Sequence, residues 1–181
     1  MPYNSSYLFT LLFVVIFLYS CQSNKKANNV QSYDVECELV CDEEYILGKP
    51  NQIAYSGSVL AVIDRGSDSL MHFFDTVKSC FINKAGRIGQ GPNEFTTISS
   101  LSPYDDGFGM YDPNLKKYYK VLYTNDTVKI ESLFKVDSLM PLNIHPISNN
   151  RYISTGIFKG SKFCLIGSDG KIISRIEEWP Y

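Results

Sequence analysis

The chain has 181 residues, of which 44% are apolar and 20% are charged. These values are ordinary for a globular domain, so they exclude a chain that is disordered throughout. The 17 basic and 19 acidic residues give a net charge of −2, which offers no electrostatic basis for a nucleic-acid partner. Only one long apolar run occurs, near the amino terminus, so a protein with several membrane-spanning helices is excluded as well.

That apolar run, residues 7–19, is shorter than the ~20 residues that a bilayer core requires and has the length of a signal-peptide core. Ser20 and Cys21 follow it. A small residue before a cysteine resembles the processing site of bacterial lipoproteins, in which the cysteine thiol receives the lipid and becomes the new amino terminus. We therefore expect a lipoprotein-type signal peptide over residues 1–20, lipidation of Cys21, and a cell-envelope location at the outer membrane. An uncleaved anchor, or a cysteine that follows an apolar run by chance, is the alternative.

Residues 21–34 are predicted to be a flexible tether, because this stretch is rich in Asn, Gln, Ser and Lys and has little to bury. Residues 35–181 are then the folded domain. Export implies an oxidising compartment, in which the remaining four cysteines could form disulfides. Cys37 and Cys41 on one strand would be ~13 Å apart, too far for a disulfide. Cys80 and Cys164 lie in apolar patterns typical of buried thiols, and cross-pairing among the four stays open.

After residue 30 no stretch keeps the 3.6-residue periodicity of a helix. Short runs of β-branched and aromatic residues, separated by Gly, Asn, Asp and Pro, predict strands instead. In chain order the predicted strands are Val35–Val40, Val59–Asp64, Met71–Asp75, Ser79–Ile82, Phe108–Asp112, Tyr118–Tyr123, Thr127–Phe134, Tyr152–Thr155, Phe163–Gly167 and Ile172–Ile176. The turn Ser168-Asp169-Gly170 makes the last two a hairpin.

The predicted strands repeat along the chain. Val59–Asp64 and Phe108–Asp112 both end in an aspartate, the two aspartates are 48 positions apart, and each strand is followed by a second apolar strand. A third unit of the same kind begins at Asn150. A period of ~40–50 residues with room for four strands is typical of β-propeller blades. The sequence therefore predicts an all-β fold made of four-stranded antiparallel blades.

A glycine-rich phrase, Gly86-Arg-Ile-Gly-Gln-Gly-Pro-Asn-Glu-Phe95, lies between the first two units. Asp112 ends the next predicted strand, and Asn114 lies in the turn after it. This phrase resembles the NHL-type propeller repeat and, more closely, the six-bladed, TolB-like propeller lipoproteins of Gram-negative bacteria. The resemblance covers most of residues 45–178. It implies a lipid-anchored propeller of the cell envelope that acts as a non-catalytic binding or scaffold module, and it supplies no ligand.

We interpret the glycine-rich phrase as a structural junction between blades, where glycine permits the positive φ of a sharp turn. Its members are Gly86, Gly89, Gly91, Pro92 and Phe95, with Phe95 expected to pack between blades. A phosphate-binding loop is disfavoured, because the phrase lacks the Gly-Lys-Ser/Thr ending and no helix pattern follows it.

Candidate ligand contacts lie at strand ends and in the junction, where propellers display their binding residues. They are Asp64, Arg65, Arg87, Glu94 and Asp112. We place Asp64 and Asp112 at the ends of the innermost strands, and we expect these polar residues first of all to cap turns and to form salt bridges between blades.

Two histidines, His72 and His145, fall in separate units without metal-ligand spacing. The sequence thus predicts no metal, no cofactor and no catalytic residue. A metal-dependent propeller hydrolase or lyase is the alternative to the binding module.

The domain of 147 residues has room for about three units of 48. Closed propellers have ~4–8 blades, because closure protects the edges of the sheets. We therefore expect a partial propeller, an open arc of three blades. It would be an inactive fragment of a longer propeller protein or a chain that a partner completes. The expected partners are the membrane, through the lipid, and a protein or glycan ligand.

Overall fold

The computed structural model describes residues 45–91, 94–124, 127–136, 140–148 and 150–176. These residues form fourteen strands: β1 Pro50–Ser56, β2 Val59–Asp64, β3 Met71–Asp75, β4 Cys80–Ala85, β5 Arg87–Ile88, β6 Glu94–Phe95, β7 Ser100–Tyr104, β8 Gly107–Asp112, β9 Lys117–Thr124, β10 Thr127–Lys135, β11 Met140–Ser148, β12 Arg151–Phe158, β13 Ser161–Ile166 and β14 Ile172–Ile176.

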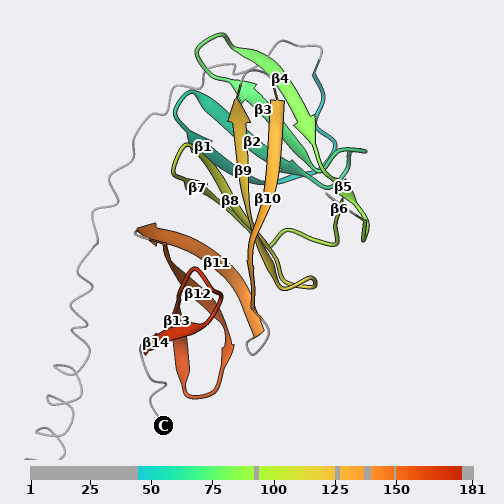
Figure 1. Cartoon of the computed structure of the whole chain (residues 1–181). Helices are drawn as coiled ribbons and strands as arrows, with labels where there is room; N and C mark the ends of the chain where they lie inside the picture. The colour runs from blue at the N-terminus through green and yellow to red at the C-terminus, as the bar shows by residue number, and fades with distance from the viewer. Residues whose placement is uncertain (1–44, 92–93, 125–126, 137–139, 149, 177–181) are drawn as a thin grey trace, which may run out of the picture. The chain divides into compact units, whose positions relative to one another are not determined.

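Twelve of the strands form three four-stranded antiparallel sheets, each with its strands in chain order (Figure 1). The first sheet is β1–β4, the second sheet is β7–β10 and the third sheet is β11–β14. The short strands β5 and β6 pair in parallel between the first two sheets in the chain. Four antiparallel strands in sequential order are the blade of a β-propeller. The predicted fold class, a partial propeller of three blades, is confirmed.

The first strand of each sheet lies against that of the next sheet, β1 against β7 and β7 against β11. The innermost strands are therefore β1, β7 and β11. The expectation that Asp64 and Asp112 end innermost strands is wrong, because these residues end β2 and β8, the second strands. The three first strands are absent from the predicted set because they carry prolines and little apolar alternation, as strands at the edge of a sheet can.

Two apolar cores join the sheets. The first core lies between the first and second sheets and includes Ile63, Phe73 and Phe108. The second core lies between the second and third sheets and includes Tyr118 and Ile144. Successive side chains of a strand point to opposite faces, so β8 and β9 contribute to both cores. The second sheet is consequently covered on both sides.

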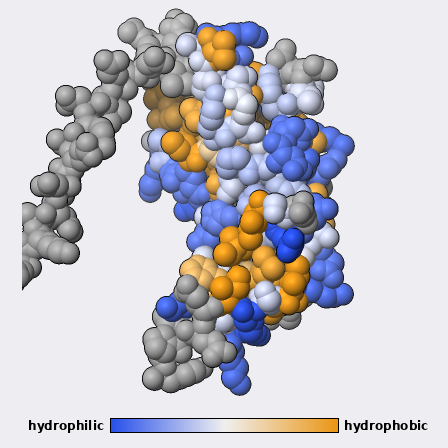
Figure 2. Space-filling model, turned by 90° about the vertical axis from the view of Figure 1, so that its left-hand side faces the viewer, coloured by the Kyte–Doolittle hydropathy of each residue, from blue (hydrophilic) through white to orange (hydrophobic). Residues whose placement is uncertain are grey.

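The third sheet exposes more apolar side chains than the other two. They are Met140, Leu142, Ile147, Ile157 and Ile173, each at least 54% exposed, and Ile176 at 39%. Figure 2 shows apolar residues gathered at the level of this sheet. Isolated exposed apolar residues are common, whereas apolar residues that gather on one surface are typical of interaction sites.

Several predicted features lie outside the described residues: the signal peptide, Cys21, the tether, the strand Val35–Val40, and both Cys37 and Cys41. In the part of the chain that is described, no helix is long and apolar enough to span a membrane. Cys80 is half-buried at the start of β4, Cys164 is buried in the second core, and both are free thiols.

Candidate functional site

Asp64 closes the turn after β2 and is fully buried. Its carboxylate accepts backbone N–H groups from Gly48 at 2.7 Å, Lys49 at 2.6 Å and Gly66 at 2.8 Å. Burial by itself would raise the pKa of Asp64, but these hydrogen bonds and the nearby His72 outweigh it and lower the pKa. The ionised carboxylate thus ties the segment before β1 to the turn after β2.

Asp112 makes an equivalent set of hydrogen bonds in the second sheet and is also fully buried. We call each of these two sets an aspartate clamp. It accepts N–H groups from Thr96 at 2.7 Å and Thr97 at 3.2 Å, ahead of β7. On its other side it accepts the N–H groups of Asn114 and Leu115, both at 3.0 Å. Neither aspartate side chain is therefore accessible to a ligand.

Arg65, next to the first clamp, is exposed but reaches across to the chain ahead of β7. Its guanidinium donates to Thr97 Oγ1 at 2.9 Å and to the backbone oxygen of Ile98 at 3.1 Å. The side chain therefore bridges the first and second sheets.

The glycines of the glycine-rich phrase leave space for the side chains of Phe95 and Glu94. Gly86 has a φ of 72°, and a Cβ there would lie 2.9 Å from the Phe95 ring, which is fully buried in the first core. Side chains at Gly89 and Gly91 would meet the Glu94 carboxylate, which accepts the N–H of Gly91 at 2.7 Å. Pro92 lies outside the described residues. The phrase thus packs Phe95 and holds Glu94.

Arg87 lies on β5 and is exposed. With Lys84 and Ser69 it lines a wide hollow of about 600 Å³ beside the turn that joins β2 to β3. No hydrogen bond or ion pair joins its guanidinium to another described residue.

The two histidines lie on different sheets. His72 is buried, and its Nε2 donates to the backbone oxygen of Ser69 at 2.8 Å, while Nδ1 pairs with the Tyr45 hydroxyl. His145 pairs through Nδ1 with Ser102 Oγ at 2.6 Å, and burial lowers its pKa. No group of three His, Cys, Asp or Glu residues in the described ranges is arranged to hold a metal ion.

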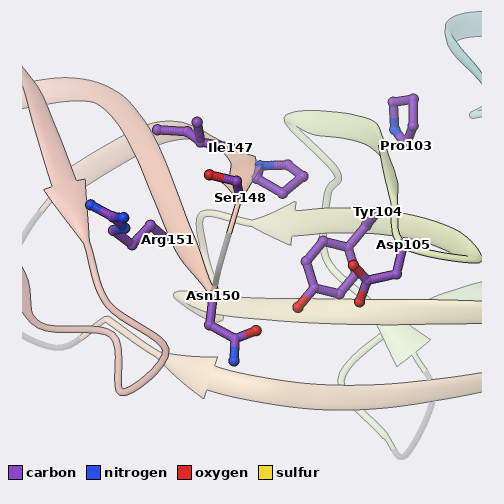
Figure 3. Close-up of a pocket in the computed structure, with 8 residues that line it drawn as sticks. Pro103, Tyr104, Asp105, Ile147, Ser148, Asn150 and Arg151 are labelled. Carbon is purple, nitrogen blue, oxygen red and sulfur yellow. The ribbon is translucent and has the colours of Figure 1, made fainter.

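A pocket of about 310 Å³ opens between the first turns of the second and third sheets (Figure 3). Tyr104 and Asp105 line it from the second sheet, and Ser148, Asn150 and Arg151 from the third. Neither Asp105 nor Asn150 is among the candidate site residues that the sequence indicates. The sequence repeat could have indicated both residues together, because each lies in the turn between the first and second strands of its sheet.

Both turn residues hold a left-handed backbone, with φ of 48° at Asp105 and 56° at Asn150. The first sheet has Gly57, with a φ of 62°, at the same turn. Asp and Asn tolerate this conformation better than other side-chain-bearing residues. The second sheet therefore places a carboxylate at the turn position where the first sheet has Gly57.

Lys120 organises the side of the pocket that belongs to the second sheet. Its Nζ lies 3.3 Å from Asp105 and 3.1 Å from Asp106, and 5.2 Å from the centre of the Tyr104 ring. Burial would lower the pKa of Lys120, but the hydrogen bonds of the two aspartates raise it overall. The Tyr104 hydroxyl lies 2.9 Å from that of Tyr152, so the ring contacts Lys120 through its face and Tyr152 through its hydroxyl.

The sequence profile of the TolB-like 6-blade propeller-like family matches residues 24–181. No curated protein matches the chain. A crystal structure of a protein described as exported, from Bacteroides fragilis, is similar with a TM-score of 0.59 at 16% identity. The similarity covers 77% of this chain but 40% of that one, so the chain spans less than half of that protein. The computationally designed protein Ika4 is similar with a TM-score of 0.49 at 11% identity, over 80% of this chain and 82% of its own. The chain belongs to the TolB-like six-bladed propeller family.

Proposed function

We propose that the chain is a lipid-anchored propeller module of the cell envelope that binds a ligand without chemical conversion. The observation that carries the proposal is the pocket between the second and third sheets. The side chains of Ser148, Asn150 and Arg151 line it and have no hydrogen-bond or ionic partner among the described residues. By contrast, the carboxylates of Asp64 and Asp112 are committed to backbone groups.

The envelope location is supported by the signal-like amino terminus and by the described export of the Bacteroides fragilis protein of similar fold. Membrane fractionation of the full chain, expressed in a Gram-negative host, tests the anchor. Wild type should sediment with membranes and Cys21→Ser should not. Cys80→Ser, at a half-buried thiol in the domain, is the matched control and should behave as wild type. A Cys21→Ser protein that stays fully membrane-bound contradicts the lipid anchor.

Native mass spectrometry of the purified chain, mixed with a library of short peptides and oligosaccharides, tests the binding role. A stoichiometric complex with a library member, released unchanged, is expected. Turnover of the bound molecule would contradict the binding module and favour an enzyme. A chain that retains no library member would contradict binding through the pocket.

We also propose that a further propeller blade from a partner chain packs on the exposed apolar face of the third sheet. Support comes from the two interfaces within the chain, where each sheet is covered by the next. A photo-crosslinking residue at Ile157, 70% exposed, should crosslink in cells to a protein that mass spectrometry identifies as one with propeller blades. The same residue at Val77, 80% exposed in a turn of the first sheet, should not. Equal capture at both positions, or none at Ile157, contradicts a blade at this face.

A further inference from the structure

We propose that the pocket between the second and third sheets binds one neutral sugar residue of a glycan. This inference rests on the proposed binding function and assigns the ligand class of the same pocket. Figure 3 shows the labelled side chains around it: Tyr104 and Asp105 on one side, and Ile147, Ser148, Asn150 and Arg151 on the other. Three properties of these residues support a neutral sugar as the ligand.

The first property is charge. Asp105 and Arg151 are the charged side chains that line the pocket, and their formal charges cancel. Lys120 is shared between Asp105 and Asp106, so it adds no free positive charge. A pocket that selects an anion or a cation carries an excess of the opposite charge. The balance here favours a neutral ligand.

The second property is hydrogen bonding. Asp105 can only accept hydrogen bonds, Arg151 can only donate them, and Asn150 and Ser148 can do both. A neutral ligand that satisfies all of these groups needs several hydroxyls that donate and accept close together. The vicinal hydroxyls of a pyranose meet this requirement. A hydrocarbon ligand would leave the polar groups unpaired, at a cost in binding free energy.

The third property is the apolar wall. Pro103 and Pro146 line the pocket with Ile147, which is 54% exposed. Their C–H surfaces suit the apolar C–H face of a sugar ring, whose hydroxyls project from its edge. The volume of about 310 Å³ lies at the lower end of the ~300–1,000 Å³ of small-molecule sites, which suits one ring. Asp105 and Arg151 are exposed, so neighbouring sugars of a longer glycan can extend into solvent.

The turns offer substitutions that remove the side chain and keep the backbone. Glycine adopts a positive φ without strain, and the first sheet already has Gly57 at this turn. Asn150→Gly and Asp105→Gly should therefore fold as wild type does, with Lys120 still held by Asp106. Ser79→Gly is the matched control, because Ser79 has a φ of 51° in the turn between β3 and β4, away from the pocket. Circular dichroism and thermal melting of all three check the fold.

Calorimetry with the full chain measures the binding. The probes are neutral oligosaccharides of glucose, galactose, mannose and N-acetylglucosamine, with glucuronic acid and a short peptide for comparison. Wild type should bind at least one neutral oligosaccharide in preference to the acid. Asn150→Gly and Asp105→Gly should weaken that binding by about tenfold or more, while Ser79→Gly leaves it unchanged.

Other outcomes separate the two proposals. Binding of the peptide or of glucuronic acid in place of neutral sugars would overturn the sugar assignment and leave the binding function standing. Sugar binding that both glycine variants retain would overturn the assignment to this pocket. A wild-type chain that binds none of these probes and nothing in the peptide and oligosaccharide library would overturn both proposals.

Discussion

The two cores that hold the three sheets together are built from different side chains. The first core contains a single tyrosine, Tyr119, among thirteen buried residues, and the rest are apolar. The second core contains three tyrosines, Tyr111, Tyr118 and Tyr152, among nine. Each tyrosine brings a hydroxyl that needs a partner when it is buried. One interface of the molecule is thus almost free of polar groups, while the other must accommodate them.

The second core satisfies these hydroxyls only in part. The Tyr152 hydroxyl pairs with Tyr104 at the pocket, but those of Tyr111 and Tyr118 are buried without a partner among the described residues. Tyr118 gains instead from ring packing, with centroids 5.2 Å from Phe134 and 4.9 Å from Tyr152. The interface beside the pocket therefore leaves two buried hydroxyls unpaired, at a cost in the free energy of unfolding, whereas the first core has a single tyrosine among apolar side chains.

The largest expected effect is in the first core. Phe73 is fully buried, so Phe73→Ala should lower the free energy of unfolding by about 3–5 kcal/mol. Phe134→Ala in the second core, where the ring is 7% exposed, should cost less. Urea unfolding followed by circular dichroism measures both. A larger loss for Phe134→Ala would contradict the expectation that a ring in the first core contributes more to the free energy of unfolding.

The next largest effect concerns the Asp112 clamp, which belongs to neither core. Asp112→Ala removes the acceptor of four backbone N–H groups, and we expect a loss of about 2–4 kcal/mol, because buried unpaired donors are costly. Asp169→Ala, in the exposed turn before β14, should change stability by less than about 0.5 kcal/mol. The same urea experiment compares them. Equal losses would show that the clamp adds nothing beyond ordinary turn capping.

A smaller effect tests the packing of Tyr118. A Cβ at Gly109 would collide with the Tyr118 hydroxyl, so Gly109→Ala should cost about 1–3 kcal/mol through overpacking. The double variant Gly109→Ala with Tyr118→Phe removes the colliding oxygen and should recover part of that loss. Thermal melting of the single and double variants decides this. Strictly additive losses would mean that the two residues do not interact.

The smallest effect appears at alkaline pH. Burial, with a smaller contribution from nearby Tyr152, raises the pKa of Tyr118 above its ordinary value of 10.0. The stability that the neutral phenol provides is complete below pH 10 and is lost as the pH rises above 10 toward the folded-state pKa. Between pH 9 and 11 wild type should lose about 1.4 kcal/mol more than Tyr118→Phe. Tyr55→Phe, at a residue that is 53% exposed, should match wild type in denaturant titrations at the two pH values.

The second and third strands of every sheet could be predicted from the sequence. Val59–Asp64 and Met71–Asp75 match β2 and β3 because both faces of these strands pack on apolar neighbours, which enriches them in β-branched and aromatic residues. The first strands could not be predicted. Pro103 in β7 and Pro146 in β11 are typical of loops, and these segments are strands because they pair with the second strand of their own sheet.

The candidate site was predicted less well than the fold. The sequence correctly marks the residues at strand ends as polar and special, but it cannot show that Asp64 and Asp112 are fully buried and bonded to backbone. The pocket depends on the distance between two turns that are far apart in the chain. That distance follows from how the second and third sheets pack, which no local pattern contains.

The aspartate clamps also have a consequence for the order of folding. Asp64 bonds residues 15 and 16 positions earlier, and Asp112 does the same, so each clamp closes a short loop within its own sheet. The bond from Ser100 Oγ to the backbone oxygen of Ile144, which joins the second sheet to the third, spans 44 positions. Closing a longer loop costs more entropy and slows folding. Each first strand should therefore be fastened to its own sheet before the sheets meet, and the pocket, which needs two sheets, should be among the last features to form.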